Sequence, residues 1–329
     1  MSPTAHPMFF SHAIRAALEE EMARDERVIL IGEDIAAYGG AFKLTAGIAE
    51  RFGRERVLNT PIAEGGFVGV AIGAAMTGLR PVAEIMFMDF ITLAADQLIN
   101  HAAKFHYQFG EQCRVPIVVR CPAGAGRGYG PTHSQSLERL FVGTPGLRVV
   151  APATAADAKG MLKSAIRCDD PVIFIESKIL YGRQGDVPAG EHMAPLQGAR
   201  VVREGDDVSL IAYSRMVEEA VKAADALAEH GVTAEVLDLR SLAPLDAEAL
   251  AATVEKTGRA VVIEEGPLTG GLGGEVVARL LETAFDFLQA PPKRVAAADV
   301  PVPASRLLEQ AVIPDYRTIA EAAAEVVAY

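Results

Sequence analysis

Two residues of the sequence, Glu64 and His133, have the type and the surroundings for acid–base chemistry. Glu64 follows Pro61 in the segment NTPIAEGGFVGVAIGAA, residues 59–75, where a glycine-rich helix should begin. One explanation for a carboxylate there is that the helix dipole stabilises anions at this end. The apolar neighbours of Glu64 support a second role, in which a partly buried carboxyl group hydrogen-bonds a nitrogen atom of a ligand.

His133 lies in a glycine- and proline-rich loop, RGYGPTHSQSLE, residues 127–138. A histidine flanked by threonine and serine is often exposed and without function, but loops over a rigid scaffold also carry many active-site groups. The remaining histidines lack partners at metal-ligand spacing. For example, His101 and His106 are five positions apart and do not share a helix face.

Glycines mark two further segments. Gly66, Gly69 and Gly73 recur at spacings of three and four, which places them on one helix face that can approach another helix closely. The loop EEGPLTGGLGGE, residues 264–275, lacks the glycine spacing of a dinucleotide-binding loop and the acidic residue about 20 positions later. We interpret it as a tight turn between a strand and a helix.

The elements that must position these residues alternate along the chain. Short apolar runs predict strands, and longer amphipathic stretches predict helices, which together favour a parallel sheet covered on both faces. In the first half the predicted strands are 27–32, 80–87, 115–121, 147–152 and 171–177, and the predicted helices are 10–24, 64–79, 89–109 and 154–167.

A stretch without sustained periodicity, residues 181–205, interrupts this pattern, which then resumes. We interpret this stretch as linking sequence with one short strand. We therefore predict two α/β domains, residues 1–185 and 206–329, joined by a linker over residues 186–205. In the second half the predicted strands are 207–214, 234–240, 259–265 and 293–299, and the predicted helices are 215–230, 246–256 and 273–288.

Composition excludes several classes of protein. The chain has 329 residues and a formal charge of −12, from 31 Lys and Arg against 43 Asp and Glu, and it lacks a basic cluster for nucleic acid. Its three cysteines are far apart, which excludes a zinc ribbon or a disulfide framework. The longest apolar stretch, residues 65–79, is too short to span a bilayer. Because the first 30 residues also lack a signal-peptide pattern, we expect a cytoplasmic protein that binds neither nucleic acid nor membrane.

Motifs in a fixed order give a resemblance that covers nearly the whole chain. The sequence resembles the beta subunit of the thiamine-diphosphate-dependent decarboxylating component of 2-oxo acid dehydrogenase complexes, which act on pyruvate, branched-chain 2-oxo acids or acetoin. The motifs are GEDI (32–35), TPIAEGGFVGVAIGAAMTGLRPVAE (60–84), FMDFITLAADQLINHAAK (87–104), THSQS (132–136), DAKGMLKSAI (157–166), the loop 264–275 and RVAAADVPVP (294–303).

The resemblance implies a transketolase-like fold, with a pyrimidine-binding domain followed by a transketolase C-terminal-like domain. It implies that Glu64 activates the cofactor, that Phe90 packs on its aminopyrimidine ring, that Met86 lines the pyrimidine pocket and that His133 is the active-site histidine. Related enzymes also bind a structural potassium ion, and Cys168 stands where relatives often have Asp. The positions that match the potassium ligands are Ile117, Ala165, Ile166, Cys168 and Asp170.

The implied activity is oxidative decarboxylation of a 2-oxo acid, pyruvate or branched-chain, with transfer of the acyl group to lipoamide. Thiamine enzymes hold the diphosphate of the cofactor through magnesium with a GDG motif, which this chain lacks. The resemblance therefore implies an alpha subunit that holds the magnesium, an alpha2-beta2 heterotetramer and a lipoyl-bearing acyltransferase core. The motifs leave open an acetoin dehydrogenase beta subunit, or a non-catalytic scaffold subunit that keeps the fold.

Overall fold

The structure is a computed structural model that describes residues 5–329, and the chain forms two compact units. Of the described residues, unit 1 comprises 5–123 and Leu140–Leu196, and unit 2 comprises Gly124–Arg139 and Gln197–Tyr329. The segment 124–139, which carries His133, therefore groups with unit 2, although it lies within the first of the domains predicted from the sequence. The two domains predicted from the sequence, residues 1–185 and 206–329, are therefore a proposal that is separate from this division into units.

Unit 1 is built on a parallel sheet whose strands follow the order β6-β7-β5-β4-β2-β3 within the unit. All residues of β2, β5 and β7 are buried, so both faces of the sheet are covered, as predicted. The strands are β2 (Val28–Glu33), β3 (Val57–Thr60), β4 (Arg80–Glu84), β5 (Val118–Ala123), β6 (Arg148–Val150) and β7 (Val172–Ser177), and β1 (Ala5–Phe9) pairs with β8 (Gln184–Pro188) as an antiparallel ribbon.

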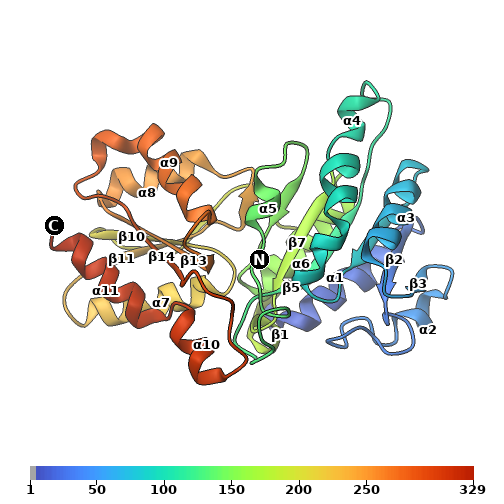
Figure 1. The fold of residues 1–329 in the computed structure, drawn as a ribbon, viewed down its shortest axis with the longest axis horizontal. Coiled ribbons are helices and arrows are strands. Elements are labelled where there is room, and N and C mark those ends of the chain that lie inside the picture. The colour runs from blue at the N-terminus through green and yellow to red at the C-terminus, as the bar shows by residue number, and fades with distance from the viewer. Residues whose placement is uncertain (1–4) are drawn as a thin grey trace. The chain divides into compact units, whose positions relative to one another are not determined.

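The helices of unit 1 surround this sheet (Figure 1). α1 and α6 pack together, and their buried faces form a core with the sheet that includes Ile14, Leu162 and Phe174. The single helix predicted over 89–109 is wrong, because the chain forms a 3-10 turn, a π-helical turn and the short helix α4 instead. The helices are α1 (Phe10–Arg24), α2 (Ile48–Phe52), α3 (Glu64–Met76), η1 (Met88–Ala94), η2 (Gln97–Ala102), α4 (Phe105–Gln108), α5 (Arg139–Val142), α6 (Ala155–Arg167) and η3 (Leu180–Gly182).

Unit 2 is a second α/β layer structure with the strand order β14-β13-β10-β11-β9, in which β9 alone runs antiparallel to its neighbour. α7 and α11 cover one face of the sheet, and α8 and α9 cover the other (Figure 1). The elements are β9 (Arg200–Arg203), β10 (Val208–Ala212), α7 (Met216–Ala228), β11 (Ala234–Asp238), β12 (Ser241–Ala243), α8 (Ala247–Thr257), β13 (Ala260–Pro267), α9 (Leu272–Ala284), η4 (Phe285–Phe287), β14 (Lys293–Ala297), α10 (Arg306–Val312) and α11 (Tyr316–Val327).

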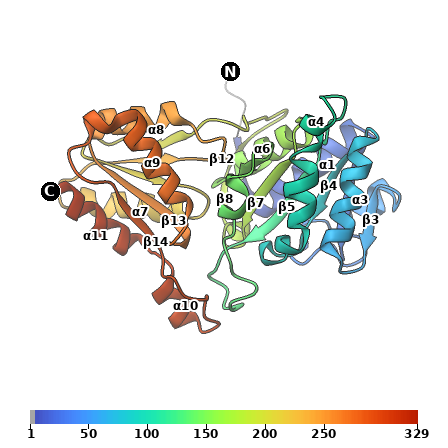
Figure 2. The same ribbon diagram turned by 45° about the horizontal axis from the view of Figure 1, so that its top comes forward.

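The short strand expected in the linker is β9, which joins the sheet of unit 2. One feature of unit 2 was not predicted: residues 306–327 form α10 and α11. α10 lies on the segment between β14 and α11 and projects from the layers of the unit (Figure 2). No helix in the described part of the chain is long and apolar enough to cross a membrane.

Candidate active site

Glu64 is the first residue of α3, and its side chain is buried, with 3% of the residue exposed. It follows β3 after a short turn that contains Pro61. The neighbouring strand β2 ends at Glu33, which lies opposite Thr60 in the parallel register. Because ligand sites of parallel sheets form at the carboxyl ends of the strands, Glu33 and Glu64 lie at the edge where a site is expected.

The carboxyl groups of Glu33 and Glu64 interact electrostatically. Burial, and next the charge of Glu64, raise the pKa of Glu33 to about 7. Oε1 of Glu33 is buried and has no hydrogen-bond partner among residues 5–329. Glu33 can therefore hold a proton near neutral pH beside Glu64. Glu33 was not among the predicted site residues, although its place at the end of a strand, within GEDI, was a usable signal.

The segment after β4 brings aromatic side chains to the same unit. Met86 and Phe90 are half-buried, and the rings of Phe87 and Phe90 meet edge to face with centroids 6.3 Å apart. α3 packs closely on η1, because a Cβ added at Gly65 would lie 2.9 Å from the carbonyl oxygen of Leu93. This contact places the start of α3, at Glu64, against the segment that contains Phe90.

A buried charge network supports the strand ends of unit 1. Arg120 Nη1 donates to Glu84 at 2.6 Å, and Arg120 Nε and Nη2 donate to the two carboxylate oxygens of Glu176 at 2.7 and 2.8 Å. The hydroxyl of Tyr181 donates to Glu176 at 2.6 Å. Burial raises the pKa of Glu84 even though Arg120 opposes this shift. The network joins β4, β5 and β7, and so fixes the strands from which the Met86 segment leaves.

His133 lies in unit 2 and is half-buried. Its backbone N–H donates to the carbonyl of Gly130 at 3.3 Å, and its Nδ1 lies 3.1 Å from Oγ1 of Thr132.

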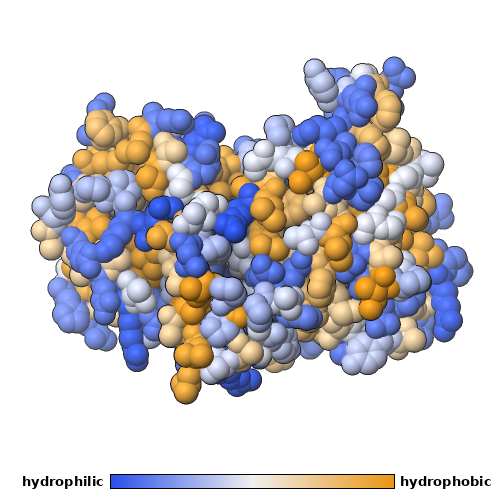
Figure 3. Space-filling view, in the orientation of Figure 1, coloured by the Kyte–Doolittle hydropathy of each residue, from blue (hydrophilic) through white to orange (hydrophobic). Residues whose placement is uncertain are grey.

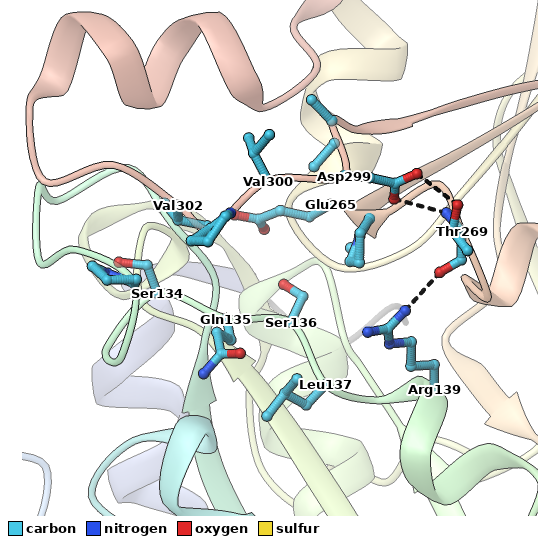
Figure 4. A pocket seen from close by; sticks show the side chains of 16 residues that line it. Ser134, Gln135, Ser136, Leu137, Arg139, Glu265, Thr269, Asp299, Val300 and Val302 are labelled. Carbon is cyan, nitrogen blue, oxygen red and sulfur yellow. Dashed lines mark hydrogen bonds between the residues drawn. The ribbon is translucent and has the colours of Figure 1, made fainter.

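The residues after His133 line a cavity of about 530 Å³ in unit 2 (Figure 4). Ser134 and Ser136 meet the segments 265–269 and 297–302 there. Arg139 Nη1 donates to the carbonyl of Thr269 at 2.7 Å, and Thr269 donates from N and Oγ1 to the carboxylate of Asp299 at 3.0 and 2.6 Å. These bonds fix the wall of the cavity opposite the histidine loop.

The strand-to-helix turn 264–275 is occupied by a carboxylate of the chain itself. Glu264 accepts a hydrogen bond from the N–H of Gly273 at 3.0 Å, at the start of α9. Burial raises the pKa of Glu264 to about 7. The amide group of Gly273 in this turn therefore binds a side chain of the same chain.

The backbone carbonyls at the predicted potassium positions already accept hydrogen bonds. Arg80 Nη1 donates to the carbonyls of Ile166 and Cys168, each at 2.9 Å. The carbonyls of Ile117 and Ala165 accept from backbone N–H groups, and Asp170 pairs with the Arg148 side chain. A cation can use only the second lone pair of each carbonyl here. Among residues 5–329, no cluster of His, Cys, Asp or Glu has the arrangement of a metal site.

Comparison with known proteins identifies both halves of the chain. The transketolase pyrimidine-binding domain family matches residues 6–184, and the transketolase C-terminal domain family matches residues 197–319. Pyruvate dehydrogenase E1 component beta subunits are similar over nearly the full length. The one from Porphyra purpurea is 44% identical over 97% of each chain, and the one from Rickettsia bellii is 45% identical over 92% of this chain and 93% of the relative.

Among solved structures, the chain is similar to a split gene transketolase described as an inactive beta4 tetramer. The TM-score is 0.79 with 24% identity, over 98% of this chain and 99% of the other. A transketolase mutant from Pichia Stipitis gives a TM-score of 0.70 with 18% identity, over the whole of this chain and 46% of the other. These likenesses show the transketolase-like fold.

Proposed function

Because the chain belongs to the family of pyruvate dehydrogenase E1 component beta subunits, and is thus a 2-oxo acid dehydrogenase beta subunit, we propose that it serves the oxidative decarboxylation of pyruvate. The relatives are named for pyruvate, which favours this substrate over branched-chain 2-oxo acids and acetoin. The acetyl group would pass to lipoamide on an acyltransferase core. The observation that carries the proposal is the buried Glu64 at the start of α3, beside Glu33.

The residues of unit 1 fit the pyrimidine half of thiamine diphosphate. When bound, this cofactor supplies the carbon nucleophile and the electron sink for removal of carbon dioxide. Glu64 would hydrogen-bond a ring nitrogen with its carboxyl group, and Phe90 and Met86 would line the ring. A protonated Glu33 would avoid a second negative charge beside Glu64. His133 would hydrogen-bond the substrate and exchange a proton with it, while Thr132 fixes its ring at Nδ1.

An alpha subunit would supply the rest of the site. The sequence contains no GDG motif for the diphosphate and magnesium, so we propose an alpha2-beta2 heterotetramer. Two exposed surfaces support a partner. The glycine face of α3 is open in part. Val70 is 61% exposed and a Cβ at Gly73 would meet nothing within 4 Å, whereas a Cβ at Gly69 would lie 3.3 Å from Oε1 of Gln97. Apolar surface also gathers over α10, where Leu307 is 79% exposed (Figure 3).

A structural potassium ion at Ile117, Ala165, Ile166, Cys168 and Asp170 remains part of the proposal. Its support is the resemblance and the closeness of two of these carbonyls, both of which accept from Arg80. The guanidinium of Arg80 already occupies one lone pair of each of these two carbonyl oxygens, so a cation must bind through the other lone pair.

The test is to purify the tagged chain from its source cells and assay the resulting complex with pyruvate, 3-methyl-2-oxobutanoate and acetoin. We expect an equimolar companion that contains a GDG motif, bound thiamine diphosphate and the highest kcat/KM with pyruvate. The chain without its companion should turn over none of the three. Turnover by the chain alone, or a preference for acetoin, would contradict the proposal.

A further inference from the structure

α10 inverts the usual distribution of polar and apolar side chains. Glu309 is 2% exposed, whereas its neighbours Leu307 and Leu308 are 79% and 59% exposed. Burying a carboxylate costs free energy unless hydrogen bonds replace its water. The partners of Glu309 therefore indicate what α10 holds in place.

The partners of Glu309 are two backbone amides of the glycine-rich loop that follows β5. The N–H of Gly126 donates to Oε1 at 2.7 Å, and the N–H of Gly128 donates to Oε2 at 3.0 Å. Both carboxylate oxygens are thus used, in charge-assisted hydrogen bonds that are stronger than neutral ones. Gly126 and Gly128 have φ values of +99° and +70°, which only glycine adopts readily and which let both amides point toward one anion.

Two further contacts bind the same loop to the rest of unit 2. The N–H of Ala125 donates to the buried carboxylate of Glu265 at 2.7 Å. A Cβ added at Gly128 would lie 3.0 Å from the carbonyl oxygen of Ala304, so the loop packs closely on the segment before α10. Figures 1 and 2 agree that the loop lies beside α10. Residues 124–130 form neither helix nor strand, so tertiary contacts such as these hold the loop in place.

The loop leads directly to His133, whose N–H donates to the carbonyl of Gly130. We infer that Glu309 is a positioning residue for His133: it holds the glycine loop 124–130 from α10 and so sets where the histidine stands. This inference rests on the proposed function, in which His133 contacts the substrate. Glu309 itself acts through the loop and touches no reacting group.

The first experiment measures how firmly the loop is held in the assembled enzyme. Arg127, between the two bonded glycines, is a trypsin site, and its cleavage requires local opening of the loop. Glu309→Gln keeps the shape of the side chain but turns an NH₂ group toward one of the two amides. We expect cleavage after Arg127 to be about tenfold faster in this variant, because opening costs less when one charge-assisted bond is lost.

Gln310→Ala is the matched control, because Gln310 is the next residue of α10 and is exposed. Its cleavage rate should equal that of the unchanged enzyme. Equal cleavage rates in Glu309→Gln and in the control would overturn the inference.

The second experiment is a double-mutant cycle on turnover. Glu309→Gln should lower kcat about tenfold, because small displacements of a catalytic group are costly. In a His133→Ala background the same change should cost nothing further, since the group that it positions is gone. Additive losses would show a merely structural role and overturn the inference. Full activity of His133→Ala would instead contradict the proposed function, while the cleavage comparison would still decide whether Glu309 holds the loop.

Discussion

Glu33 at the end of β2 and Glu64 at the start of α3 form an interacting pair of buried carboxyl groups, in which the negative charge of Glu64 adds to burial in raising the pKa of Glu33. The two residues are 31 positions apart, yet the parallel pairing of β2 with β3 brings their segments to one edge of the sheet. A pair of this kind can keep one proton at neutral pH.

The raised pKa of Glu33 predicts a dependence of stability on pH. Its pKa is about 7 in the folded chain, against an ordinary value of 4.5. Between pH 4.5 and 7 the folded state keeps a proton that the unfolded state has lost. The contribution of Glu33 to the free energy of unfolding is therefore complete below pH 4.5 and is lost as pH rises through 7. The total loss in the free energy of unfolding is roughly 3 kcal/mol, from 1.36 kcal/mol per pKa unit.

Urea unfolding between pH 5 and 8 should show this decline in the unchanged chain and a flatter profile in Glu33→Gln. The exposed Glu50→Gln should behave like the unchanged chain, and an unaltered slope in Glu33→Gln would contradict the assignment.

Replacement of Glu64 should remove catalysis without unfolding the chain. In Glu64→Gln the carboxyl group that hydrogen-bonds the pyrimidine ring is lost, so turnover of the assembled enzyme should fall at least about 100-fold, the range for a lost acid–base group. Steady-state assay with pyruvate, together with the thermal midpoint of the same preparation, measures both effects. A non-catalytic scaffold subunit would show the same turnover in Glu64→Gln and in the unchanged enzyme.

The Arg120 network should be a large contributor to the stability of unit 1. In Arg120→Met, the buried carboxylates of Glu84 and Glu176 lose their cation. Breaking a buried ion pair in this way costs about 3–5 kcal/mol, whereas an exposed pair contributes less than about 1 kcal/mol. The exposed pair of Arg51 with Glu19 supplies the control, Arg51→Met. Denaturant unfolding should show a much larger loss in the free energy of unfolding for Arg120→Met than for Arg51→Met. Equal losses in the two variants would mean that the network is not important for stability.

Potassium should stabilise the chain if the proposed cation site is real. A ligand that binds only the folded state raises the free energy of unfolding as its concentration rises. The thermal midpoint in potassium chloride should therefore exceed that in lithium chloride at equal ionic strength. Arg148→Ala, which removes the partner of Asp170, tests whether that end of the site matters. Equal midpoints in the two salts would remove potassium from the proposed function.

Much of the fold could be predicted because hydrophobic periodicity is a local property. α1 has the predicted bounds, Phe10–Arg24. β2 is shifted by one residue at each end, and β7 begins one residue later than predicted. The helix predicted over 89–109 was wrong because the same spacing of apolar residues serves a 3-10 turn, a π turn and an α-helix. α10 escaped prediction because its leucines face outward and its glutamate faces inward.

The sequence by itself determined most of the alternation of strands and helices and the two α/β halves. It also predicts Glu64, Phe90 and His133 as residues of the site. Only the tertiary structure decided which groups meet: Glu33 with Glu64 across two strand ends, and Glu309 with Gly126 across 183 positions. The physical reason is that periodicity reports which side of an element is buried, whereas the meeting of strand ends and loops depends on the path of the whole chain. A buried carboxylate finds its hydrogen-bond donors only once that path is complete.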